Sequence, residues 1–390
     1  MSELRLNPLY LTPEHVAFRE TVRRFVASEI TPHAAAWDEA GTFPRELYRK
    51  AAEVGLLAPG FPDEYGGVAD TDAFHRLVAC VELAQCGAGG LLASLMSHTI
   101  ALPPIALLGT PGMKSRVLAP VLAGEKIAAL AITEPGGGSD VAALRTTARR
   151  VGEEFIVDGE KTFITSGLRA DYYTVAVRTD PQAPGARGIS LLLIERDAPG
   201  FSRTPLAKMG WWASDTAQLR FDGCRVPVSN LIGPEGAGFR AIMHNFNAER
   251  FTMAAQSLGF AWVCYEESLA WARERQAFGQ RIVDHQVMRH RFVDMRTRIE
   301  ATRALVEDTA RRLQHAPAGD PETVAAVCMA KNFATRCLQF CADAAVQALG
   351  GMGYMRGTRS ERIYREVKVM MIGGGTEEIM KDLAARQLGL

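Results

Sequence analysis

The chain has 390 residues, with 44 Lys and Arg against 44 Asp and Glu, so its formal net charge is zero. This balance argues against a nucleic-acid-binding surface and against a polybasic membrane patch, because both need a positive face. With 47% hydrophobic and 23% charged residues, the composition is typical of a globular protein of two or three domains.

We expect neither a membrane span nor a secretory signal. The sequence has no run of 18 apolar residues, and its start has no basic segment followed by an apolar core. The seven cysteines form no C-x-x-C pair, which favours reduced thiols packed in the core. We therefore predict no metal site and a cytoplasmic location.

The chain begins with helical periodicity over residues 14–124. Apolar residues recur at three- to four-residue steps from Val16 to Ile30, after a Thr12-Pro13 pair that suits a helix start. Gly and Pro separate further predicted helices over residues 44–54, 73–85 and 91–108.

A β pattern follows over residues 127–225, and helices then return. Asp158-Gly159 is a hairpin signal. Short strands are predicted over 154–161, 171–178, 188–195 and 216–221, and long helices over 246–275, 284–314, 322–349 and 377–388. This order predicts an α+β fold, because a doubly wound parallel sheet needs strands and helices to alternate. The glycine motifs of NAD-binding and P-loop proteins are also absent from the sequence.

Two segments within the β region could hold a flat ligand. Residues 131–140 contain three consecutive glycines flanked by Thr133 and Ser139. Glycines let a backbone approach a ligand closely, although an interdomain loop explains them as well. Residues 161–167 place Phe163 between hydroxyl side chains, which suits stacking on and hydrogen bonding to a heteroaromatic ring.

Three more segments lie in the C-terminal helical region. Arg275 near the end of a helix could bind a pyrophosphate, or could be an ordinary charged terminus. Residues 347–354 read as a glycine turn after a helix. At residues 372–379, three glycines precede Thr376, an N-cap candidate whose helix start could bind an anion or a carbonyl oxygen.

These five segments, in this order and spacing, resemble the acyl-CoA dehydrogenase family of flavoenzymes over essentially the whole chain. Residues 131–143 fit the family's first signature without a mismatch, and the motifs at 275–279, 347–353 and 375–378 agree with it. The resemblance implies an N-terminal all-α domain (1–126), a middle β-barrel-like domain (127–235) and a C-terminal four-helix bundle (236–390).

The resemblance also implies non-covalent FAD between the β domain and the bundle. It implies a homo-oligomer, a tetramer rather than a dimer, in a bacterial cytoplasm, with electron-transfer flavoprotein as the electron acceptor. One group of residues would reach the FAD of a neighbouring subunit: Arg275, Phe278, Gln286, Gln347, Gly350 and Gly351. The other residues that it places at FAD are Ile132, Thr133, Gly138, Ser139, Phe163, Ile164, Thr165, Thr376 and Glu378.

The catalytic base depends on two alternative positions. Many relatives have a Glu directly before the Gly-Thr of the last motif, where this chain has Gly374. The isovaleryl-CoA and long-chain branches carry the Glu on a bundle helix before an Arg, which corresponds to Glu249-Arg250 here. The resemblance therefore makes Glu249 the predicted base. The implied substrate contacts are Ser139, Asn247, Arg250, Gly374 and Gly375.

The implied reaction converts a saturated acyl-CoA to a trans-2-enoyl-CoA. Glu249 would take the α-proton, and the β-hydrogen would leave as hydride to flavin N5. Two departures from the family pattern are Phe163, where Trp is frequent, and Asn247, where relatives have Asp. The alternatives are a flavin oxidase or monooxygenase of the same fold that uses oxygen, and a non-catalytic acyl-CoA-binding homologue. The length and branching of the acyl chain stay open.

Overall fold

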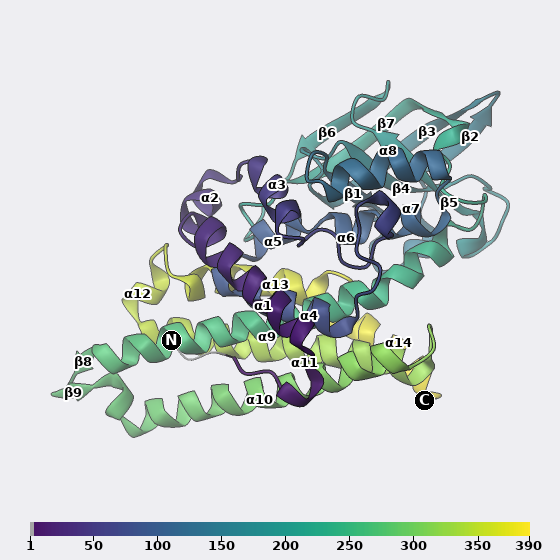
Figure 1. Ribbon diagram of the computed structural model, residues 1–390. Coiled ribbons are helices and arrows are strands. Elements are labelled where there is room, and N and C mark those ends of the chain that lie inside the picture. Colours follow the sequence, from purple (N-terminus) through teal and green to yellow (C-terminus); the bar gives the residue numbers. More distant parts are fainter. Residues whose placement is uncertain (1–3) are drawn as a thin grey trace.

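Three groups of elements follow one another along the chain: short helices, a sheet and a set of long helices (Figure 1). The computed structural model describes residues 4–390, apart from the side chain of His244. The order α, β, α confirms the expected fold class. Within the described residues, no single helix is long and apolar enough to cross a membrane.

The N-terminal helices begin as the capping residues predict. The Thr12 side chain accepts a hydrogen bond from the backbone N–H of His15, which caps α1. Three helices replace the one expected over 91–108, with breaks after Leu95 and after Ala101. At the second break Pro103 and Pro104 start a new helix rather than extend the previous one. These helices are α1 (Pro13–Phe25), α2 (Ala34–Ala40), α3 (Glu46–Glu53), α4 (Ala73–Leu83), α5 (Gly89–Leu95), α6 (His98–Ala101), α7 (Pro103–Leu108) and α8 (Pro111–Leu122).

The middle region is one seven-stranded sheet in the order β1-β4-β2-β3-β7-β6, with β5 paired to β4. β4 runs parallel to β1 and β2, and the other pairs are antiparallel. The strands are β1 (Ala128–Ala131), β2 (Thr147–Val151), β3 (Glu154–Thr165), β4 (Tyr172–Arg178), β5 (Ile189–Glu195), β6 (Phe201–Pro205) and β7 (Thr216–Pro227).

The hairpin expected at Asp158-Gly159 is wrong, because both residues lie inside β3. The tight connection is instead at residues 152–153, between β2 and β3. Gly159 has φ +143° and marks a register shift against β7, which is a β-bulge. A Cβ atom at Gly159 would lie 2.7 Å from Cα of Thr146, so the glycine serves a close approach of two backbones rather than a turn.

The C-terminal helices form an elongated bundle in which α11 packs against α9, α10, α13 and α14 (Figure 1). Helix α9 starts at Gly238, before the predicted residue 246, because its first turns bury Ala241 and Ile242 against the apolar residues of β5. The elements are α9 (Gly238–Glu274), β8 (Gln276–Ala277), β9 (Gln280–Arg281), α10 (Gln286–His315), α11 (Pro321–Leu349), α12 (Gly351–Tyr354), α13 (Arg359–Ile372) and α14 (Glu377–Leu388).

Candidate active site

The loop between α13 and α14 consists of Gly373, Gly374 and Gly375. Gly374 and Gly375 have φ values of +66° and +109°, a region of backbone conformation that favours glycine. Thr376 ends the loop as the N-cap of α14, and its hydroxyl accepts a hydrogen bond from the backbone N–H of Ile379. The predicted helix start is thus confirmed, with the exposed Glu378 in its first turn.

Helix α9 brings Glu249 directly against this loop. A Cβ atom built at Gly374 would lie 3.9 Å from Oε1 of Glu249, 3.8 Å from Cγ of Arg250 and 3.0 Å from Sδ of Met253. The carboxyl group of Glu249 therefore occupies the space into which a side chain at position 374 would project. The two alternative positions for an acidic residue, far apart in the sequence, converge on one place in the fold.

Two cations hold the backbone carbonyls of the loop. Arg250 donates from Nε to the carbonyl oxygen of Gly374 at 3.0 Å, and Lys331 on α11 donates from Nζ to that of Gly375 at 2.5 Å. Asn247, a predicted substrate contact, accepts a longer bond of 3.5 Å from Arg250. Within residues 4–390, the N–H of Gly374 has no hydrogen-bond acceptor. Among the same residues the N–H of Gly375 has no acceptor either, so the loop presents two free amide donors, and Gly374 lies beside the carboxyl group of Glu249.

Burial sets the acidity of Glu249. Loss of solvation raises the pKa of its carboxyl group above the ordinary value, while the positive charges of Arg250 and Lys331 act in the opposite direction. A carboxyl group with a raised pKa is a stronger base once it is ionised. This is the property that removal of a weakly acidic carbon-bound proton requires.

The other glycine segment, residues 135–138, follows β1 and lies on a buried ion pair. Nζ of Lys161, a fully buried residue of β3, donates to the carbonyl oxygen of Ile132 at 3.0 Å and to Oε1 of Glu134 at 2.8 Å. Glu134 also accepts backbone N–H bonds from Arg145 and Thr146. These bonds therefore fix the loop on its buried side. Gly138 and Ser139 are exposed, and Thr133 is half-buried.

A bulge in β3 turns Phe163 outward. The pairing of β3 with β7 shifts register between Lys161 and Ile164, and Phe163 has φ +60°. As a result its ring is 71% exposed, although its neighbours Thr162 and Ile164 are buried. Ile132 is buried as well, so Ile132 and Ile164 can offer a ligand only backbone atoms. Thr165 is half-buried beside the exposed ring.

The remaining predicted cofactor residues lie at the opposite end of the bundle. Figure 1 shows β8, β9 and α12 at the end that points away from the sheet, while α14 lies at the other end. Phe278, at the tip of the β8–β9 hairpin, is 98% exposed. Within one chain, the predicted cofactor residues at this end therefore do not meet those at the two glycine loops. The predicted cofactor residues at this end are Arg275, Phe278, Gln286, Gln347, Gly350 and Gly351.

Family comparisons agree with this architecture. Three domain families cover the chain: acyl-CoA dehydrogenase N-terminal domain over residues 12–125, middle domain over 129–224 and C-terminal domain over 236–389. The chain belongs to the acyl-CoA dehydrogenase family. It is therefore a member of a family of oxidoreductases that use FAD.

Individual relatives cover nearly the whole chain. The rat mitochondrial long-chain specific acyl-CoA dehydrogenase is 37% identical, over 96% of this chain and 86% of the relative. The crystal structure of an acyl-CoA dehydrogenase from Geobacillus kaustophilus superposes with a TM-score of 0.92 at 39% identity, covering 98% of this chain and 99% of the other. A glutaryl-CoA dehydrogenase from Mycobacterium smegmatis in complex with FADH2 reaches 0.90 at 26% identity, covering 98% and 96%.

The residues at the first glycine loop of this acyl-CoA dehydrogenase fit an isoalloxazine ring. The exposed Phe163 offers an apolar face, and Thr133, Ser139 and Thr165 carry hydroxyl groups. The backbone N–H of Thr162 donates to the carbonyl oxygen of Thr133 at 2.8 Å, which joins the first glycine loop to β3 beside Phe163. Cβ atoms built at Gly136 would meet nothing within 4 Å, so space lies above the loop. An aromatic ring left exposed on a strained bulge is expected where a ligand covers it.

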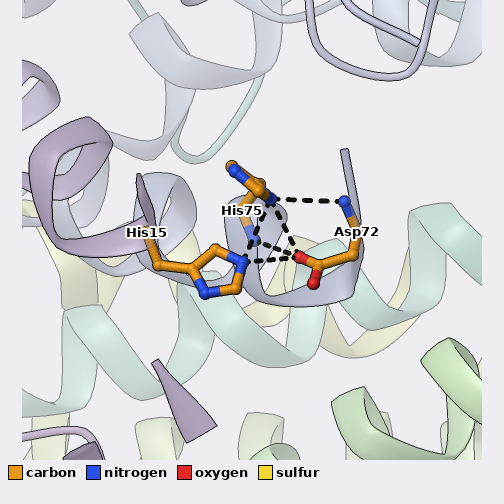
Figure 2. Close-up of side chains that lie close together, drawn as sticks. All are labelled: His15, Asp72 and His75. Carbon is orange, nitrogen blue, oxygen red and sulfur yellow. Dashed lines mark hydrogen bonds and ion pairs between the residues drawn. The ribbon is translucent and has the colours of Figure 1, made fainter. Parts of the chain in front are cut away.

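Sequence reasoning missed a compact group formed by His15, Asp72 and His75 (Figure 2). Nε2 of His15 lies 2.9 Å from Oδ1 of Asp72 and 3.1 Å from Nδ1 of His75. Nδ1 of His15 accepts the backbone N–H of Thr12 at 3.0 Å, so Nε2 carries the proton and has no free lone pair for a metal. Asp72 in turn caps α4. The group joins the starts of α1 and α4, and its chemistry does not suit a metal ligand set.

Proposed function

We propose that this protein dehydrogenates a saturated acyl-CoA thioester at the α and β carbons, with Glu249 as the base that removes the α-proton. The proposal rests on one observation: Oε1 of Glu249 lies 3.9 Å from the position that a Cβ atom at Gly374 would take. A family member without an acidic residue at position 374 keeps a carboxyl group at that place. This argues against a non-catalytic acyl-CoA-binding protein.

The loop supplies the complementary electrostatics. As the α-proton leaves, negative charge develops on the thioester oxygen, and a fixed N–H donor stabilises it. Gly374 offers a free N–H, and the bonds from Arg250 and Lys331 to the adjacent carbonyls hold it in place. Ser139, Asn247 and Gly375 are the further substrate contacts of this proposal. The product is a trans-2-enoyl-CoA.

FAD, when bound, supplies the acceptor for the hydride that leaves the β-carbon. We assign its flavin end to the Phe163 side of the sheet and its diphosphate to the start of α14, at Thr376 and Glu378. Residues at the β8–β9 end of the bundle would bind the FAD of a neighbouring copy, because they lie far from the seven-stranded sheet of their own chain (Figure 1). The exposed Phe278 supports such an interface. We therefore propose a cytoplasmic homotetramer that passes its electrons to electron-transfer flavoprotein.

An anaerobic visible spectrum tests the proposal. The purified protein is mixed with isovaleryl-, octanoyl- and palmitoyl-CoA in turn, and we expect bleaching of a flavin band by at least one of them. The most effective compound also identifies the acyl class, which the geometry leaves open. Rapid reoxidation of the reduced flavin by air would instead favour an oxidase.

The Glu249→Gln variant tests the base. We expect it to lower the rate constant of flavin reduction by roughly 10²–10⁴-fold, because it removes the proton acceptor. Glu267→Gln is the matched control: this carboxylate, on the same helix, accepts the backbone N–H of Ser360 at 2.6 Å, remote from the loop. Reduction at the wild-type rate in Glu249→Gln would refute the assignment of the base.

The pH dependence has a defined direction. Since burial raises the pKa of Glu249, flavin reduction in the wild type should increase with pH through that raised value, as the carboxylate form accumulates. The residual rate of Glu249→Gln should lack this dependence.

A further inference from the structure

Lys331 is a buried cation beside the candidate base. It has no exposed surface, and it donates from Nζ to the carbonyl oxygen of Gly375 at 2.5 Å. In the part of the chain that the structure describes, this is the only hydrogen bond of Nζ. Burying an ammonium group with one neutral partner is costly. Packing alone therefore gives no reason for a lysine at this position of α11.

Three titratable or charged groups act on Lys331. Glu249 and Arg250 face it from α9, and Cys328 lies one turn earlier on its own helix. Burial, followed by the charge of Arg250, lowers the pKa of Lys331 to about 8, and Glu249 opposes this. The protonated lysine in turn favours the charged form of Glu249. The two groups are thus electrostatic partners without a direct hydrogen bond.

Lys331 also belongs to a row of α11 side chains that bond the loop and the first residue of α14, Glu377. Its neighbour Asn332 donates to the carbonyl oxygen of Glu377 at 3.0 Å, and Arg336 pairs with the Glu377 carboxylate at 2.8 Å. Arg250 holds the carbonyl of Gly374 from the opposite helix. A run of three glycines has high conformational freedom. The bonds from Arg250 and Lys331 therefore restrain the glycines themselves, and those from Asn332 and Arg336 anchor the helix that follows.

We propose that Lys331 is a positioning residue for proton abstraction, which fixes the 373–375 loop against Glu249 and stabilises the ionised carboxylate. This inference rests on the proposed function, since it assigns Lys331 a part in the step that Glu249 performs. It has two separable components, the hydrogen bond to Gly375 and the positive charge near Glu249.

Two variants of the FAD-loaded enzyme separate these components. Lys331→Met removes both donor and charge, and should lower the rate constant of flavin reduction about 10- to 100-fold. The acid limb of its pH profile should move up by about one pH unit, because a nearby positive charge is lost. Lys331→Gln keeps a donor, so it should recover part of the rate with the limb still displaced.

Thr335→Val is the matched control, one turn further along α11. Thr335 is buried and donates to the carbonyl oxygen of Asn332 at 3.2 Å, so the variant loses a buried hydrogen bond without touching the loop. It should leave both the rate constant and the acid limb unchanged. A rate loss in Lys331→Met no greater than in this control, with the same acid limb as the wild type, would overturn the proposal.

A substrate-free measurement separates this inference from the proposed function. Infrared difference spectra between each protein and its Glu249→Gln counterpart follow the protonation of the Glu249 carboxyl group. Its titration should lie at higher pH in Lys331→Met than in the wild type. If no acyl-CoA reduces the wild type, the proposed function fails, while an unchanged titration would refute the role of Lys331 independently.

Discussion

Gly374 shows how a missing side chain shapes the site. Its φ of +66° is one that residues with a side chain rarely adopt, and a Cβ atom there would lie 3.0 Å from Sδ of Met253. The same Cβ would point at the carboxyl group of Glu249, 3.9 Å away. The residue therefore leaves room both for a substrate and for the base. A single methyl group should disturb both.

We expect Gly374→Ala to lower flavin reduction by an acyl-CoA at least about tenfold, since the positive φ alone costs roughly 1–2 kcal/mol and the loop must shift. Stopped-flow absorbance measures the rate constant. Gly319→Ala is the control, because Gly319 also has a positive φ, +83°, but open space around it. It should lose similar stability and keep its rate. Equal rates in both variants would show that the space above Gly374 is not used.

At the scale of elements, β3 and the first glycine loop depend on one ion pair. Lys161 is fully buried, its pKa is lowered by burial to about 8, and Glu134 compensates the charge. Removing one member of a buried pair leaves the other unpaired, at a typical cost of about 3–5 kcal/mol. Because the pair supports the loop beneath Gly138 and Ser139, the loss should also weaken FAD binding.

Lys161→Met should therefore lower the free energy of unfolding by an amount of this order and reduce the FAD content of the purified protein. Urea titration and the ratio of flavin to protein absorbance measure the two effects. The double variant Glu134→Gln/Lys161→Met removes the unpaired charge, so it should be more stable than Lys161→Met alone. Strictly additive losses would contradict the role of the pair.

The elements that the sequence predicts best are those with strong local signals. The start of α1 at Thr12-Pro13 and the helix after Thr376 follow from capping chemistry. The hairpin predicted at Asp158-Gly159 is wrong because the glycine is needed where the backbone of Thr146 approaches closely. This contact joins two separate segments, so a local sequence pattern does not contain it. Of the two breaks in the expected 91–108 helix, only the second has a local signal, the Pro103-Pro104 pair; the break after Leu95 has none of this kind.

The site residues also divide into those with a local sequence signal and those whose role depends on contacts between distant segments. Without the family resemblance, Glu249-Arg250 reads as an ordinary surface pair, because nothing local reveals that α9 passes the 373–375 loop. Lys331 carries one local signal, a lysine within an apolar helical stretch, but its contact with Gly375 is made across two helices. The group formed by His15, Asp72 and His75 joins two helix starts by a tertiary contact.

At the scale of the whole molecule, the bundle separates two sets of predicted cofactor residues. The sheet, the 373–375 loop and α14 lie toward one end, and the β8–β9 hairpin lies at the other (Figure 1). If both sets bind FAD, at least two copies must pair so that the hairpin of one reaches the site of the other. Assembly and cofactor binding should then be linked, with FAD favouring the oligomer.

The free energy of unfolding of the whole molecule depends on pH through two buried groups, because their pKa values are shifted in opposite directions. Burial lowers the pKa of His98 to about 4, and its Nε2 donates to the carbonyl oxygen of Leu57. Burial, together with the charge of Asp38, raises the pKa of Glu366 to about 7. Between about pH 4 and 6.5 the unfolded chain binds a proton at His98 that the folded one does not, so this term stabilises as pH rises. Between about pH 4.5 and 7 the folded chain holds a proton at Glu366 that the unfolded one releases, so this term destabilises as pH rises.

The two terms oppose each other in the wild type, and single variants separate them. Relative to the wild type, Glu366→Gln should gain stability from pH 4.5 to 7, and His98→Gln should lose it from pH 4 to 6.5. Each difference should change by about 1.4 kcal/mol per pH unit within its window, since one proton is involved. Urea unfolding at half-unit steps of pH measures both, and each difference should be constant above pH 7.5. A stability difference that stays constant through its pH window would show that the group has the same protonation in the folded and unfolded chain. The effect of burial on its pKa would then be offset by neighbouring groups, such as the N–H groups of Gly89 and Gly90 that donate to Glu366.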